Sequence, residues 1–128
     1  MAYYLTKTIK MDFDSAIENV TKALGEQGFG VVTEMNITAI FKNKLDKDFR
    51  NYRILGACNP PQAFKSIEID DKIGTLLPCN VVLQEIEGDL IEVSAIDPNA
   101  YLDIIRNDAM TEVMDLIHQR LKNALDSI

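Results

Sequence analysis

The spacing of apolar residues switches between two repeats along this chain, and the switch restricts the fold more than any other feature. Residues 4–11 alternate between polar and apolar side chains, and the β-branched Thr6 and Thr8 favour an extended strand. From Phe13 the apolar residues follow a helical repeat, with Asp12 or Asp14 available as the N-cap and Gly28 at the end. A strand that leads directly into an amphipathic helix predicts a sheet with helices packed against it.

The next segment, residues 29–41, fits two structures. Apolar residues alternate through it without a break, which favours one long strand. Asn36, however, is a good N-cap for a helix over residues 37–45. We favour a strand to Met35 followed by this helix, because a strand of more than a dozen residues is long against the usual ~5–6.

The remaining pattern continues to alternate between strands and short helices. We expect an extended stretch over 52–57, a short helix over 62–67 with Asn59 as its cap, and an irregular link over 74–78. A hairpin of strands 80–86 and 90–96 is expected next. A helical segment that is capped by Asp97 and reaches Ile105 then precedes a final helix from Asp108. No repeat or Gly/Ser-rich linker divides the chain. Residues 1–128 therefore predict one compact α+β domain, with a mostly antiparallel sheet and helices packed on one face.

The charge balance argues against two classes of partner. The chain has 13 Lys and Arg against 20 Asp and Glu, a net charge of −7, so nucleic acid is not an expected partner. No apolar run approaches the ~20 residues that cross a bilayer, and the first residues do not resemble a secretory signal. We therefore expect no membrane partner and a cytoplasmic location, where the two cysteines stay thiols.

Two short segments do not look like generic scaffold. Each contains a Cys-Asn dipeptide beside proline: Cys58-Asn59 precedes Pro60-Pro61, and Cys79-Asn80 follows Pro78. Cys58 is expected just ahead of a helix N-terminus, where outward-pointing amides and the helix dipole favour a thiolate. If the strands that carry these segments are neighbours, both sulfur atoms can face one pocket.

Three interpretations of the two thiols stay open. Free cysteine is among the most buried residue types, so inert packing is the simplest. A functional thiol pocket is the second. A metal site is the third, but two cysteines and one histidine fall short of four zinc ligands and no CxxC pair occurs. We expect no metal and no cofactor.

The same segments carry a family resemblance. GACNPP at residues 56–61, LLPCNV at 76–81, DFRNYRIL at 48–55 and GFGVVTE at 28–34 resemble the domain of unknown function family 302. The resemblance runs over nearly the whole chain. It implies a compact α+β domain that is plausibly dimeric, and it implies no established activity.

Three further features have both a functional and a structural interpretation. Arg53 shares a strand face with Leu55 and can orient an oxyanion ligand, but a salt bridge to an acidic residue is the simpler explanation. His118 lies beside the apolar stripe of the last helix, which suits a boundary residue better than a general base. That stripe, which includes Met110 and Met114, is most simply core, and a dimer seam is its alternative.

These observations support three hypotheses about function. The first is a small-molecule-binding module whose pocket is lined by Arg53, Cys58, Asn59, Cys79 and Asn80 and suits a small polar or sulfur-containing ligand. The second is a thiol-dependent enzyme in which Cys58 transfers a sulfur or acyl group. The third is a non-catalytic, homo-oligomeric interaction domain whose cysteines only pack, and a homodimer is the partner that we expect. We assign no catalytic residue, and whether the chain is an enzyme stays open.

Overall fold

The computed structural model describes residues 2–128 and contains one antiparallel sheet of five strands in the order β1-β5-β4-β3-β2. The strands are β1 (Tyr4–Lys10), β2 (Gly30–Asn36), β3 (Tyr52–Cys58), β4 (Cys79–Glu87) and β5 (Leu90–Ile96). Every neighbouring pair is antiparallel, and β1 pairs with β5 although the two strands are far apart in the sequence. The predicted hairpin is confirmed as β4 and β5.

The helices begin largely where capping side chains predict. They are α1 (Phe13–Glu26), α2 (Ile37–Leu45), α3 (Pro60–Ile69), α4 (Leu102–Ile105) and α5 (Asp108–Asp126), with 3-10 turns η1 (Ile73–Leu76) and η2 (Pro98–Tyr101). Asp12 accepts a hydrogen bond from the Ser15 amide, Asn36 from the Ala39 amide and Asp97 from the Asn99 amide, each at 3.0 Å. The choice of a helix over residues 37–45 is therefore confirmed.

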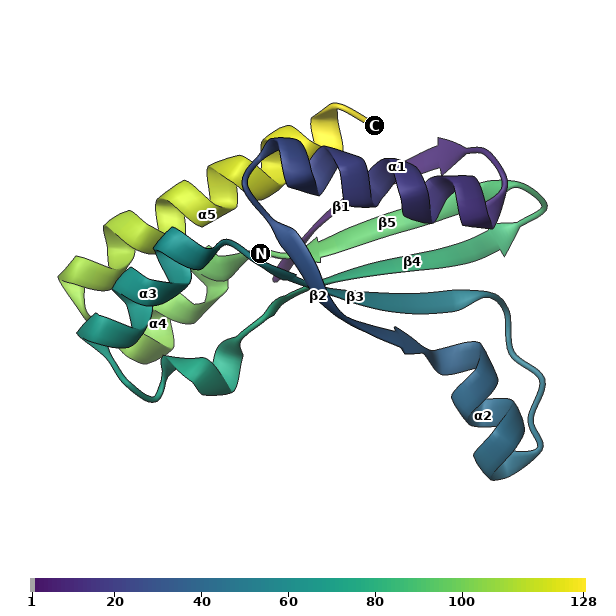
Figure 1. Cartoon of the computed structure of the whole chain (residues 1–128), viewed down its shortest axis with the longest axis horizontal. Helices are drawn as coiled ribbons and strands as arrows, with labels where there is room; N and C mark the ends of the chain where they lie inside the picture. The colour runs from purple at the N-terminus through teal and green to yellow at the C-terminus, as the bar shows by residue number, and fades with distance from the viewer. Residues whose placement is uncertain (1) are drawn as a thin grey trace.

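The core lies between one face of the sheet and helices α1 and α5 (Figure 1). Side chains on β5 alternate, so that Ile91 and Val93 are fully buried under the helices while Glu92 and Ser94 point to the other face. The predicted α+β class, with an antiparallel sheet and helices on one face, is confirmed. The apolar stripe of α5 is buried in this core, so it is not available as a dimer seam.

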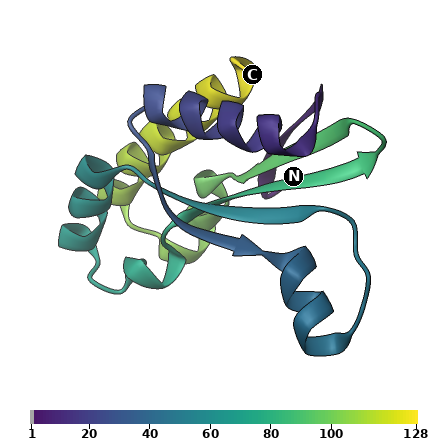
Figure 2. The same cartoon turned by 45° about the vertical axis from the view of Figure 1, so that its right-hand side comes forward.

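Helix α2 is the exception to this layering. It lies on the opposite side of the sheet from α1 and α5 in both views (Figures 1 and 2) and has no buried residue. Thr38 ties it to the start of β3, because its hydroxyl donates to the Arg50 carbonyl at 2.7 Å and accepts from the Tyr52 amide at 2.9 Å. Phe49 adds an edge-to-face contact with Phe41, with the ring centroids 5.3 Å apart.

The sheet therefore keeps one face that α1 and α5 do not cover, which we call the open face.

None of the helices in the described chain combines the length and the apolar character that a membrane crossing needs.

Candidate functional site

The two Cys-Asn segments lie on neighbouring strands. Gly56 pairs with Asn80 and Ala57 with Cys79 in the β3–β4 register. Thr33 and Pro78 crowd the space above Gly56, so the two motifs meet at a glycine that leaves no room for a side chain. The two motifs therefore contact each other through Gly56 and the Pro78 ring, which are packing groups and not reactive ones.

The five residues predicted to share one pocket are divided between the two faces of the sheet. Cys79 is buried on the helix-covered face, and Arg53 shares that face by strand alternation. Asn80 is exposed on the open face, and Cys58 follows Ala57 by one residue, so it also points away from the helices. The strand register therefore does not bring these five residues together on one face: it offsets the two cysteines by one residue, and one residue reverses the face.

Cys79 lies in an apolar environment that suppresses its ionisation. Its side chain is 6% exposed and borders a space of about 10 Å³ whose other walls include Tyr101 and Met114. Burial, and secondarily the neighbouring Cys58, raises the pKa of the Cys79 thiol to about 11. Burial also raises the pKa of Tyr101, with the charge of Cys79 as the smaller cause. At neutral pH Cys79 is a neutral, packed thiol.

Cys58 lies just ahead of α3 as predicted, but the helix start offers it few amides. Pro60 and Pro61 occupy the first two helical positions and carry no N–H. The Ala63 amide already donates to the Asn59 carbonyl at 2.9 Å. Of the first three residues of the helix, therefore, only Gln62 has an N–H that can face an anion, which weakens the argument for an activated thiolate.

Titration of the native protein with a chromogenic disulfide is expected to distinguish the two thiols. Half-buried Cys58 reacts first, whereas Cys79 reacts only after denaturant is added, because burial hinders access and the thiol stays protonated. A Cys58→Ser variant assigns the fast phase. Two equivalents released at one rate in the native state would show that Cys79 is accessible.

Arg53 has an acidic partner. Its guanidinium forms an ion pair with Glu34 on β2, and its Cζ lies 5.9 Å from the centre of the Phe13 ring. The salt-bridge interpretation of Arg53 is thus confirmed. The Arg53 Nε is buried and makes no hydrogen bond within residues 2–128.

Asn59 stands at the N-cap of α3 as expected, but its side chain makes no capping hydrogen bond. Its amide group lies instead against Gly28, with Nδ2 3.3 Å from where a Cβ would stand. Gly28 has φ +86°, the left-handed conformation that ends α1. Asn59 therefore packs where helix α1 turns into β2.

His118 has a partner that its sequence position did not indicate. Its Nδ1 lies 2.9 Å from Oδ1 of Asp97, the same oxygen that caps η2. This supports the boundary-residue interpretation. Within residues 2–128, no three His, Cys, Asp or Glu side chains gather as metal ligands.

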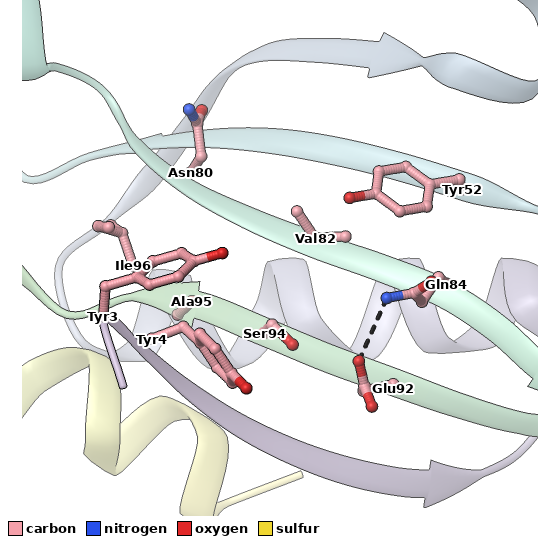
Figure 3. Close-up of a pocket in the computed structure, with 10 residues that line it drawn as sticks. All are labelled: Tyr3, Tyr4, Tyr52, Asn80, Val82, Gln84, Glu92, Ser94, Ala95 and Ile96. Atoms are coloured by element: carbon pink, nitrogen blue, oxygen red, sulfur yellow. Dashed lines mark hydrogen bonds between the residues drawn. The ribbon is translucent and has the colours of Figure 1, made fainter. Parts of the chain in front are cut away.

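The open face contains the hollow that sequence reasoning missed. We call it the open-face hollow; its volume is about 290 Å³, and it extends over β4 and β5 from the N-terminal tyrosines to β3 (Figure 3). Its walls are Tyr3, Tyr4, Tyr52, Asn80, Val82, Gln84, Glu92, Ser94, Ala95 and Ile96. Of the five predicted site residues, this hollow includes Asn80 alone. The sequence contained a signal for this polar face: polar residues alternate with apolar ones along the hairpin, at Asn80, Gln84, Glu92 and Ser94.

Hydrogen bonds fix the polar groups along one side of the hollow. Gln84 and Glu92 are directly paired across β4 and β5, and the Gln84 Nε2 donates to the Glu92 Oε1 at 3.2 Å. Arg50 Nε donates to the Gln84 Oε1 at 2.9 Å, which orients the amide. Ser94 lies 3.1 Å from the Thr6 hydroxyl across β1.

Comparison with known proteins gives a family match and a fold match. Residues 5–128 match the family model described as domain of unknown function DUF302. A crystal structure described as the uncharacterized conserved protein DUF302 from Bacillus stearothermophilus superimposes with a TM-score of 0.90 at 25% sequence identity, covering 98% of each chain. No curated protein matches this sequence.

Proposed function

The chain belongs to the family of domains of unknown function DUF302, and we propose that it is a small-molecule-binding module whose ligand occupies the open-face hollow. The observation that carries this proposal is the convergence of aromatic and polar side chains from four strands and the N-terminal segment on one concavity. Concave sites with a few oriented polar groups are the usual form of small-ligand sites.

The volume sets the size of the ligand. Small-molecule sites usually have volumes of roughly 300–1,000 Å³, so a hollow of about 290 Å³ suits a ligand of one ring or a short chain. Val82 and Ile96 supply apolar contact, while Asn80, Gln84 and Ser94 supply hydrogen-bonding groups. In Figure 3 the hydroxyl groups of Tyr3 and Tyr52 point toward the middle of the hollow from opposite sides.

The geometry gives less support to a thiol-dependent enzyme. Burial raises the pKa of Cys79 to about 11, so almost none of it is thiolate at neutral pH. Cys58 precedes a helix whose first two residues are prolines. Neither sulfur lines the open-face hollow.

Small aromatic probes test the proposal by NMR. We expect at least one of benzylamine, benzyl alcohol and benzoate to shift backbone amides of β4 and β5 around the hollow at millimolar concentration, the range in which fragments of this size bind. Ser94 stands between Val82 and Thr6 on neighbouring strands, so Ser94→Phe fills the hollow and is expected to abolish these shifts.

Thr111→Phe is the matched control, because it adds a ring at an exposed position of α5 far from the hollow. This variant is expected to keep the wild-type shifts. If none of the three probes perturbs the amides around the hollow, or if Ser94→Phe leaves the shifts unchanged, the hollow is not a ligand site and the proposal fails.

A further inference from the structure

The charge within the open-face hollow indicates the class of its ligand, an inference that rests on the proposed function. Among the described residues that line it, Glu92 is the only charged one. Glu92 forms no salt bridge within residues 2–128. The wall of the hollow thus contains an acidic group that no cation among residues 2–128 neutralises directly.

The hydrogen bonds around Glu92 leave room for a second partner. Its Oε1 accepts from Gln84, and its Oε2 accepts no hydrogen bond in the described chain. Arg50 contacts Gln84 and not Glu92: its Nε donates to the Gln84 Oε1, and Gln84 lies between Arg50 and Glu92. The carboxylate is therefore oriented by one neutral donor and keeps an acceptor free for another.

The aromatic walls favour the same sign of charge. Tyr3 and Tyr4 stack edge to face, with ring centroids 5.1 Å apart, at one end of the hollow, and Tyr52 stands at the other (Figure 3). The faces of aromatic rings attract cations, and tyrosine and serine hydroxyls accept hydrogen bonds from N–H donors. The net charge of −7 attracts a small cation at longer range.

We propose that the open-face hollow binds a small primary amine in its protonated form, with the ammonium group on Glu92 and an apolar body over Val82 and Ile96 between the tyrosine rings. An anionic ligand is disfavoured, because no Lys, Arg or His of the described chain lines the hollow to neutralise it. A neutral ligand gains the apolar contact but not the ion pair.

The three probes named above share one ring and differ in charge, so their dissociation constants from NMR titration test the inference directly. Benzylamine is expected to bind about tenfold more tightly than benzoate and about fivefold more tightly than benzyl alcohol, as one partly screened ion pair provides. Glu92→Gln keeps an acceptor for Gln84 and removes the charge, and it should abolish the preference for benzylamine. Glu87→Gln removes the same charge outside the hollow and should keep it.

The outcomes separate this inference from the proposed function. If benzyl alcohol or benzoate binds in the hollow as tightly as benzylamine, or if Glu92→Gln keeps the preference, the amine assignment is wrong and the binding module stands. If no probe binds, the binding module and the amine assignment both fail.

Circular dichroism of each variant verifies that the fold is retained. A benzylamine affinity that falls with added salt in the wild type but not in Glu92→Gln supports the ion pair.

Discussion

Replacing Gly56 by alanine is expected to lower the free energy of unfolding by about 3 kcal/mol, as overpacking of a tightly filled site does. A Cβ at Gly56 would overlap the Thr33 hydroxyl oxygen and would lie 2.7 Å from Cγ of Pro78. Both neighbours are stiff, because threonine is branched at Cβ and the proline side chain is a ring. The strands must therefore separate locally to admit one methyl group. Urea unfolding followed by circular dichroism measures the loss.

Gly30→Ala is the matched control, since Gly30 is also a strand glycine and a Cβ there meets nothing within 4 Å. It should leave stability unchanged or slightly raised, because alanine restricts the unfolded chain more than glycine. Adding Thr33→Ala to Gly56→Ala removes the worse overlap and should recover part of the loss. If Gly56→Ala and Gly30→Ala changed the free energy of unfolding equally, the sheet would accommodate a methyl group at residue 56 without strain, and the prediction would be wrong.

Local features of this fold were predictable from the sequence because local interactions determine them. Asp12, Asn36 and Asp97 cap the helices expected of them, and each accepts the predicted kind of backbone hydrogen bond at 3.0 Å. A cap needs only residues two or three positions apart, so its signal is contained in a short window. Asn59 is the instructive exception: it occupies the cap position, yet its side chain packs against Gly28, about thirty residues away.

The candidate site was harder to predict because it depends on strand register. The two Cys-Asn motifs look alike in sequence and lie on paired strands, but a one-residue offset puts Cys79 under the helices and Cys58 on the other face. No pattern within either motif reveals that offset. Pro78 and Thr33 both lie close to Gly56, and this close packing explains why residue 56 has no side chain.

The open-face hollow shows the same division between local and long-range information. The floor of the hollow could be predicted from the sequence, because polar residues alternate with buried ones along the β4–β5 hairpin. Its walls could not, because Tyr4 reaches the hollow only through the pairing of β1 with β5, and Tyr52 through the pairing of β3 with β4. Those pairings join segments far apart in the chain, and the sequence pattern leaves their order undetermined.

The stability of the protein is expected to fall by about 2–3 kcal/mol, through Cys79 alone, as the pH rises from about 9 to about 11. Burial raises the pKa of this thiol from 9.0 to about 11, so the folded state keeps its proton over a range in which the unfolded state loses it. The folded state then binds more protons than the unfolded state, and the free energy of unfolding decreases with pH. Below pH 9 both states are protonated and the contribution is fully present.

Urea unfolding of reduced protein at several alkaline pH values tests this, with Cys79→Ala as the informative variant. Other groups, including Tyr101, also ionise in this range, so the comparison is between slopes: stability of Cys79→Ala should fall less steeply than that of the wild type. Cys58→Ala keeps the buried thiol and should retain most of the wild-type slope, because burial is a larger cause of the raised pKa than the neighbouring Cys58. Identical slopes in the wild type and Cys79→Ala would show that Cys79 ionises inside the folded protein as easily as outside it. That result would contradict its packed position between β4 and the helices.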